Sequence, residues 1–282
     1  MSKIGILVCG NSGIDYEKVN HPYEVIHSTL IIDNKEYEDF VDITADEFYD
    51  ILEKNPNVPL STAQASTGLI AEKLEKMKKD GYTDVIAVII SSALSGTYQN
   101  VVLAGGMVEG LKVHTIDTHT VSYGQMFLVN KTIEMIKAGK SVEEIVTVLE
   151  ETKEKIQVYV LVDTLKFLVK NGRLSIASGA IGSLLKIKPL LNFTKTGHLV
   201  AYEKIRTSSK ARARLIEIIK KEIDKGVEAI FFAYTNNKAY VQAIQNEIKE
   251  YAPTIPSVVV SLTPVVGAHA GPGTCGVGIL RK

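Results

Sequence analysis

The segment DVIAVIISSALSGT, residues 84–97, joins a strand pattern to the start of a helix and decides the fold class. Its first part, Asp84 to Ile90, is almost entirely apolar and β-branched, which indicates a buried strand. Serine, glycine and threonine follow and open a helix near Tyr98. Similar strands are expected at Lys3–Val8 and Lys112–Ile116. Because such strands alternate with amphipathic stretches up to about Glu150, the sequence predicts an α/β fold whose first part is a three-layer domain around a parallel sheet.

One segment between the first two strands departs from this alternation. Residues Tyr23 to Ile43 resemble a hairpin that turns at Asp33-Asn34, since these residue types tolerate the left-handed backbone of a tight turn. Helix boundaries are marked by two capping boxes and two glycines, namely Thr44 with Glu47, Ser141 with Glu144, Gly81 and Gly139.

The pattern changes from Gln157 onward. A strand to Val162 precedes a helical stretch over Asp163–Lys170, and a hairpin is expected around Thr194–Gly197, followed by helix, strand, helix and strands. This order favours a second α/β domain with a mixed or antiparallel sheet. We therefore expect domains at residues 1–155, with a hairpin insertion at about 23–43, and at 156–282. No linker rich in Pro, Gly or Ser separates them, which predicts a substantial interface.

Composition excludes several classes of partner. Lys plus Arg and Asp plus Glu each number 32, so no net charge would attract nucleic acid or an anionic membrane. Two cysteines, Cys9 and Cys275, cannot form a disulfide framework and fit a reducing cytoplasm. The N-terminal apolar run is too short for a signal peptide, and the run from Val85 to Ile90 is too short to span a bilayer.

Four loops at strand ends or helix starts are rich in hydroxyls and glycine: Cys9–Gly13, Ser61–Gly68, Ser91–Thr97 and Asp117–Gly124. In open α/β sheets, ligands gather beyond the carboxyl ends of the strands. Unpaired N–H groups at a helix start, together with Ser or Thr hydroxyls, make an anion site suited to a carboxylate or a phosphate. Helix capping explains any one loop alone, but four together favour a binding site.

The second half adds basic candidates for that site. Arg173 follows Asn171-Gly172, Arg206 stands alone, and His269 precedes Ala270-Gly271-Pro272-Gly273. Arginine binds a carboxylate through paired hydrogen bonds, and histidine can donate one more. The spacing does not choose between Arg173 and Arg206.

Other motifs lack the context that their chemistry requires. Gly271–Gly276 matches a dinucleotide-binding pattern but leaves no room for the following helix, so a tight turn is expected. Gly139-Lys140-Ser141 is similar to the end of a phosphate-binding loop, but Glu134 replaces the required earlier glycine. The segment is therefore interpreted as a helix end followed by a new cap. His114 and His119 lack further ligands at zinc spacing. Ser183–Lys186 has serine–lysine hydrolase spacing, but the apolar stretch Ile181–Leu191 around it favours core or the wall of a tunnel.

Taken in order, these segments resemble the DegV family of bacterial fatty-acid-binding proteins, the lipid-carrying partners of a fatty acid kinase. The similarity covers essentially the whole chain. The matching pieces are Thr62–Ser66, Ser91–Gln99, Asp117-Thr118 with Ser122 and Gly124, Asn171–Arg173, Lys188-Pro189, and His269 with Gly271–Gly273. The resemblance implies two α/β domains with a long-chain fatty acid enclosed between them, no catalysis and no cofactor. It leaves chain length, saturation preference and oligomeric state open.

The resemblance also assigns residues. Thr62, Ser95, Gly96 and His269 correspond to positions that contact the lipid carboxylate, whereas Arg173 and Arg206 lie near the head group and serve the ligand or kinase docking. Two departures from the family pattern concern the head group: Asn11-Ser12 replaces Asp-Ser after the first strand, and Ala63 and Ala65 replace a hydroxyl and a proline.

An enzyme is the alternative to a carrier. Ser95 could act as a nucleophile with His119 or His269 as the base, or the chain could be a small-ketone phosphotransferase, since the family shares its first-domain fold with dihydroxyacetone kinase. Against a hydrolase, Ala93 stands where the nucleophile elbow needs glycine. Against a kinase, the sequence has no nucleotide-phosphate loop. A DNA-linked regulator lacks a basic helix.

Overall fold

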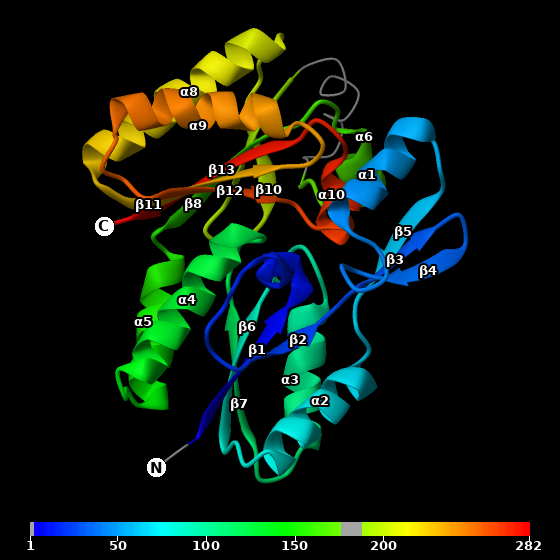
Figure 1. The fold of residues 1–282 in the computed structure, drawn as a ribbon, viewed down its shortest axis with the longest axis vertical. Helices are drawn as coiled ribbons and strands as arrows, with labels where there is room; N and C mark the ends of the chain where they lie inside the picture. Colours follow the sequence, from blue (N-terminus) through cyan, green and yellow to red (C-terminus); the bar gives the residue numbers. More distant parts are fainter. Residues whose placement is uncertain (1–2, 176–187) are drawn as a thin grey trace.

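The computed structural model describes residues 3–175 and 188–282. Three sheets organise the chain, and Figure 1 shows them with their helices. The predicted motif Ser183–Lys186 and the apolar residues Ile181 to Ile187 lie outside the described residues.

The first sheet is parallel, in the order β2-β1-β6-β7. Its strands are β1 (Ile4–Cys9), β2 (Glu24–Ile26), β6 (Asp84–Ile89) and β7 (Lys112–Asp117). Helices α2 (Thr67–Lys79) and α3 (Thr97–Met107) cover one face, and α4 (Tyr123–Lys137) and α5 (Val142–Lys153) cover the other. The predicted three-layer parallel domain is confirmed. Two short 3₁₀ helices, η1 (Gly10–Ser12) and η2 (Ile14–Tyr16), follow β1.

The second sheet is mixed, in the order β10-β9-β8-β13-β11-β12, and only β11 and β12 run parallel. Its strands are β8 (Ile156–Leu161), β9 (Leu190–Phe193), β10 (Leu199–Glu203), β11 (Val227–Tyr234), β12 (Ser257–Ser261) and β13 (Cys275–Arg281). Helices α8 (Ser208–Lys225) and α9 (Lys238–Tyr251) pack on one face, around Leu215, Ile219 and Phe232. The prediction of a mixed sheet is confirmed.

A third, small sheet lies beside the second half of the chain. It consists of β4 (Lys35–Glu38), β3 (Thr29–Ile32) and β5 (Leu60–Ala63), all antiparallel. Helix α1 (Ala45–Lys54) and helix α10 (Pro264–Ala270) pack against it, and Leu30, Phe48 and Val265 share one core. Residues of the first half therefore bury an apolar surface on a helix near the C-terminus (Figure 1).

Local signals placed most boundaries correctly. Asp33 and Asn34 have positive φ angles at the β3–β4 turn, both capping boxes form, and Gly81 and Gly139 have the left-handed backbone of helix ends. The expected turn at Gly271–Gly276 is also present, since Gly271 and Gly273 both have positive φ angles. Leu190 and Leu191 are fully buried in β9.

Several expectations were wrong in extent. Glu24–Ile26 is not part of the hairpin but joins the parallel sheet beside β1. Ser61–Ala63, expected as loop, belongs to strand β5 (Leu60–Ala63) because this strand completes the small sheet against β3. Pro264–Ala270 is a helix that the expected run of strands omitted. The predicted helical stretch at Asp163–Lys170 is reduced to α6 (Lys166–Lys170).

Candidate functional site

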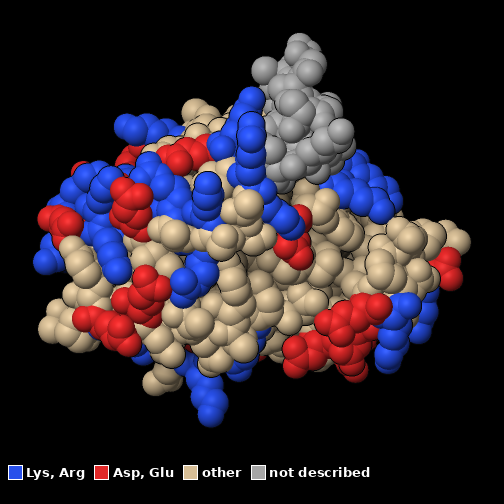
Figure 2. Space-filling model, turned by 90° about the horizontal axis from the view of Figure 1, so that it is seen from above, with Lys and Arg blue, Asp and Glu red and all other residues tan. Residues whose placement is uncertain are grey.

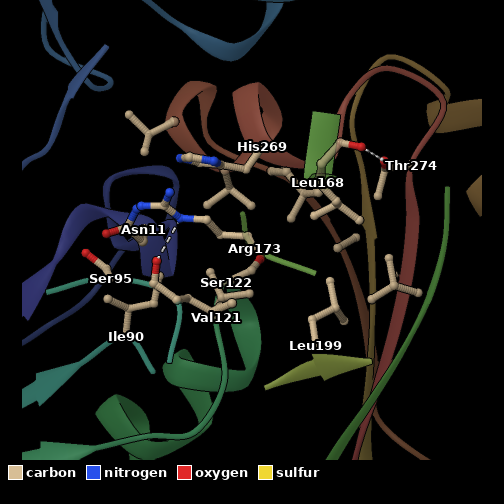
Figure 3. Close-up of a pocket in the computed structure, with 18 of the residues that line it drawn as sticks. Asn11, Ile90, Ser95, Val121, Ser122, Leu168, Arg173, Leu199, His269 and Thr274 are labelled. Atoms are coloured by element: carbon tan, nitrogen blue, oxygen red, sulfur yellow. Dashed lines mark hydrogen bonds between the residues drawn. The ribbon is translucent and has the colours of Figure 1, made fainter. Parts of the chain in front are cut away.

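A cavity of about 410 Å³ lies where the three sheets meet. Its apolar wall comes mainly from β8, β9, β10, β11 and α10, and its polar residues come from β5 and loops of the first half together with Arg173, His269 and Thr274 (Figure 3). The apolar lining includes Ile90, Leu94, Val121, Val158, Val160, Val162, Leu168, Phe193, Leu199, Phe231, Leu262, Val265 and Val266. The polar lining includes Asn11, Ser28, Thr62, Gln64, Ser95, Ser122, Arg173, His269 and Thr274. This separation of polar and apolar lining suits an amphiphile.

Thr62 and His269 form a pair across the cavity's polar end. Thr62 lies on β5 and His269 on α10, and Thr62 Oγ1 is 2.8 Å from His269 Nε2. Burial, aided by the positive charge of Arg173, lowers the pKa of His269 to about 4. The imidazole is therefore neutral near pH 7. Its other nitrogen, Nδ1, is buried without a hydrogen-bond partner among the described residues.

Contacts from the small sheet and α1 hold α10 in position. Asp39 Oδ1 accepts a hydrogen bond from the Val265 backbone N–H in the first turn of α10 (3.1 Å). The Tyr49 hydroxyl donates to the Leu262 carbonyl (3.2 Å). Because these contacts join residues more than 200 positions apart, the Thr62–His269 pair depends on docking between the two halves of the chain.

Ser95 and Gly96 lie at the start of α3, as the sequence predicted. The Ser95 hydroxyl is 2.8 Å from Thr97 Oγ1 and 3.4 Å from Gln64 Oε1. Ser95 lines the cavity, whereas Gly96 contributes no lining. A Cβ at Gly96 would lie 2.7 Å from the Gln64 side-chain amide, so glycine lets Gln64 approach the cavity edge.

Arg173 extends into the cavity from the turn after α6. Gly172, with a φ of 67°, ends that helix, and Arg173 Nε donates to the Leu94 carbonyl at 3.1 Å. Figure 3 shows its guanidinium group beside Asn11 and Ser95. Among the described residues, none of the ion pairs involves Arg173. The undescribed stretch 176–187 contains neither Asp nor Glu in its sequence. The positive charge of Arg173 thus faces an apolar cavity without a carboxylate of its own.

Arg206 lies elsewhere. It is exposed, just before Thr207, which caps α8, and it does not line the cavity. The structure therefore separates the two arginines that the sequence could not distinguish.

Five further polar residues line the cavity and were not among the predicted site residues: Asn11, Ser28, Gln64, Ser122 and Thr274. Asn11, Ser28 and Ser122 are 5%, 8% and 5% exposed. Asn11 and Ser122 fall in two of the hydroxyl-rich loops that the sequence marked, but Ser28 gave no signal. Ser122 has a φ of 58°, a backbone conformation that costs about 1–3 kcal/mol for a residue other than glycine. Such strain is commonly found at functional sites.

The two other histidines singled out in the sequence, His114 and His119, make contacts elsewhere. His114 Nε2 is 3.1 Å from Asp84 Oδ1, and His119 Nε2 is 3.7 Å from Asp117 Oδ2. Neither histidine lines the cavity. In the described parts of the chain, no group of three or more His, Cys, Asp or Glu could hold a metal ion, and no helix is long and apolar enough to cross a membrane.

Comparisons with known proteins identify the family of this chain. A family model described as "Uncharacterised protein, DegV family" matches residues 3–282. A DegV domain-containing protein of Clostridium acetobutylicum is 33% identical over 287 residues, and the match covers 100% of both chains.

Two solved structures extend the comparison. The fatty acid binding DegV family protein of Streptococcus agalactiae is 30% identical with a TM-score of 0.91, and the match covers 100% of both chains. DegV of Bacillus subtilis, described as a fatty acid binding protein, is 29% identical with a TM-score of 0.90 and the same coverage. With a family model that spans nearly every residue, this chain belongs to the DegV family.

Proposed function

We propose that this chain binds a long-chain fatty acid and presents its carboxylate to a fatty acid kinase for acyl phosphate formation, with no chemistry of its own. Thr62, Ser95, Arg173 and His269 hold the carboxylate, and the apolar lining encloses the tail. The names of the Streptococcus agalactiae and Bacillus subtilis relatives as fatty acid binding proteins support this assignment. We place the carrier in the cytoplasm, where ATP is available and where the free thiols of Cys9 and Cys275 stay reduced.

Arg173 is the observation that carries the proposal. A partly buried guanidinium without a carboxylate partner is costly, because desolvation is not offset by an opposite charge. A ligand carboxylate would provide that charge and accept hydrogen bonds from the remaining N–H groups of the guanidinium. The neutral His269 and the Thr62 and Ser95 hydroxyls add donors without adding charge.

The apolar lining explains why the ligand should carry a long tail. Burying about fifteen methylenes at about 0.8 kcal/mol each gives roughly 12 kcal/mol before the costs of association and ordering. This is comparable to the free energy of nanomolar binding, about 12 kcal/mol. The tail therefore supplies most of the affinity, and the polar end fixes orientation.

The geometry does not favour a hydrolase. Ser95 hydrogen-bonds Gln64 and Thr97, while His269 is bonded to Thr62. Within residues 3–175 and 188–282, no histidine forms a hydrogen bond with Ser95, so the nucleophile and base that acyl transfer requires are not paired.

The test compares an acid with its uncharged ester. Delipidated protein should bind palmitic acid in strong preference to methyl palmitate, and organic extraction of the freshly purified protein should release a fatty acid. Arg173→Gln should reduce the preference for the acid by about 10- to 100-fold, as expected for one charge-assisted hydrogen bond. Arg173→Lys keeps the positive charge and should retain much of the preference. Equal binding of acid and ester by the wild-type protein would refute the carboxylate site.

The kinase part of the proposal concerns Arg206. Lys and Arg side chains are abundant over the face that carries α8 and α9 (Figure 2), although several are paired with acids, such as Arg212 with Glu247. Arg206 is exposed near this face, outside the cavity. Arg206→Glu should leave fatty acid retention unchanged and slow ATP-dependent phosphorylation of the bound acid by a bacterial fatty acid kinase. Loss of retention in this variant would argue for a ligand role instead.

A further inference from the structure

The cavity is bounded along the second sheet by three cross-strand rows of residues. The row nearest His269 consists of Val162 and Thr274, which flank the pair Leu161–Cys275 at the ends of β8 and β13. The Thr274 hydroxyl donates to the carbonyl of Ala270, the residue after His269, at 3.0 Å. The middle row pairs Val160 with Gly276 and Gly276 with Ala233. The end row pairs Val158 with Gly278 and Gly278 with Phe231. The next residues on the same face, Ile156, Ala229 and Leu280, do not line the cavity.

The central strand β13 contributes a glycine to the middle row and another to the end row, but the two glycines differ. A Cβ at Gly276 would have its nearest neighbour, Ala233 Cβ, at 3.5 Å, which is an ordinary contact, so this position is open to the cavity. A Cβ at Gly278 would lie 1.9 Å from Cε1 of Phe231. The Phe231 ring therefore lies directly over the Gly278 backbone and closes the groove that Gly276 leaves open.

Two aromatic residues at the start of α4 fix the Phe231 ring. The ring centroids of Tyr123 and Phe127 lie 5.9 and 5.7 Å from that of Phe231, and 5.6 Å from each other. Phe231 is 1% exposed. Tyr123 also lines a second hollow of about 210 Å³, together with Ser12 and Tyr234. The rings of Phe231 and Tyr123 thus stand between the two hollows.

We propose that Phe231, seated on Gly278 and backed by Tyr123 and Phe127, is the end wall that limits the length of the bound acyl chain. This inference rests on the proposed fatty acid binding and concerns the selectivity of the same cavity. Successive residues on a strand rise by about 3.3 Å, so moving the wall by one row lengthens the groove by roughly 7 Å. Each additional methylene that becomes buried should raise affinity about fourfold.

The experiment measures chain-length selection directly. Wild-type protein and the Phe231→Ala variant are delipidated and reloaded from an equimolar mixture of saturated fatty acids from dodecanoic to docosanoic acid, and the bound acids are quantified by mass spectrometry. The wild type should show an upper length limit. In Phe231→Ala, occupancy by acids beyond that limit should rise relative to shorter acids, by up to about fourfold per added methylene.

Two further variants keep the result interpretable if Phe231→Ala folds poorly, which thermal unfolding would reveal. Gly278→Ala should displace the ring toward the cavity and shift the limit to shorter acids, opposite to Phe231→Ala. Gly276→Ala adds one methyl group to the open floor and should reduce loading of all acids that pass it, without moving the upper limit.

The outcomes separate the two proposals. If wild-type protein takes up none of the acids, both the proposed function and the end wall are refuted. If it takes them up but folded Phe231→Ala and Gly278→Ala keep the wild-type length distribution, only the end wall is refuted.

Discussion

At the scale of single residues, the polar end of the cavity combines one fixed charge with a histidine held neutral. Burial and the nearby Arg173 guanidinium lower the pKa of His269 to about 4. A bound carboxylate would oppose the effect of Arg173, since a negative charge favours the protonated imidazole. The protonation state of His269 is therefore expected to depend on whether a carboxylate ligand is bound.

The lowered pKa of His269 predicts a pH dependence of stability in the delipidated protein. The unfolded state, with a pKa near 6.5, binds more protons than the folded state between about pH 4 and 6.5. The free energy of unfolding should therefore decrease as the pH falls through this window, by at most about 3 kcal/mol from this group. Denaturant unfolding of wild type and His269→Gln across the window isolates the effect, because the variant should lack this component. Identical pH profiles for the two proteins would contradict it.

The residue scale also shows what sequence could and could not predict about the site. Thr62, Ser95, Arg173 and His269 all line the cavity. The sequence could mark such residues because hydroxyls in loops before helices and a lone histidine beside glycines are local signals. Arg173 and Arg206 could not be ranked, because what distinguishes them is that Arg173 is partly buried and lines the cavity, whereas Arg206 is exposed outside it. That property depends on residues far apart in the sequence.

At the scale of elements, the predicted parts were those with strong local patterns. The long apolar run of β6 indicates a buried strand, and the capping boxes of α1 and α5 mark helix starts. Both signals can be recognised without contacts from distant parts of the chain. The missed elements are short: β2 has three residues, β5 four and α10 seven. Helices this short are marginal alone, so α10 depends on tertiary contacts such as the Asp39 cap and the core shared with Phe48.

Asp39 gives the prediction that belongs to this scale. It is 1% exposed, and burial raises its pKa to about 6, although the Val265 N–H and Thr263 stabilise the charged form. The folded state therefore binds more protons than the unfolded state between about pH 4 and 6, so this group lowers stability as the pH rises through that window. Asp39→Asn keeps an acceptor for Val265 N–H and removes the buried charge.

The Asn variant should raise the free energy of unfolding near pH 7 by about 1–3 kcal/mol, and the gain should disappear below about pH 4. Asp39→Ala removes the acceptor as well and leaves the Val265 N–H unpaired, so it should recover less of this gain or none. Denaturant unfolding at both pH values tests the pair of variants. A gain in Asp39→Asn that persists unchanged at low pH would show that charge is not its cause.

At the scale of the whole molecule, the cavity exists only while the two halves remain docked. The tip of the β9–β10 hairpin inserts between loops of the parallel sheet, and the Ser91 hydroxyl donates to the Gly197 carbonyl at 2.9 Å. Strands β9 and β10 carry Phe193 and Leu199, which line the cavity. A displacement of this tip would therefore change the wall of the cavity.

Gly197 allows a direct test of that coupling. Its φ is 74°, and a Cβ there would lie 2.1 Å from Ser91 Oγ and 2.9 Å from His119 Cα. Gly139 has a similar φ of 70°, but a Cβ there would meet no atom within 4 Å, so Gly139→Ala incurs only the left-handed backbone cost, about 1–2 kcal/mol. Gly197→Ala adds a steric overlap between the halves. It should lower the free energy of unfolding by clearly more than Gly139→Ala and should also reduce the fatty acid that co-purifies.

The comparison between the two alanine variants, measured by denaturant unfolding and by quantified lipid extraction, separates backbone strain from disruption of the interface. If both variants lose equal stability and retain the same amount of lipid, the hairpin tip does not support the cavity. If only Gly197→Ala loses lipid, the polar residues of the first half and the apolar strands of the second form one site because the Ser91–Gly197 contact keeps them together.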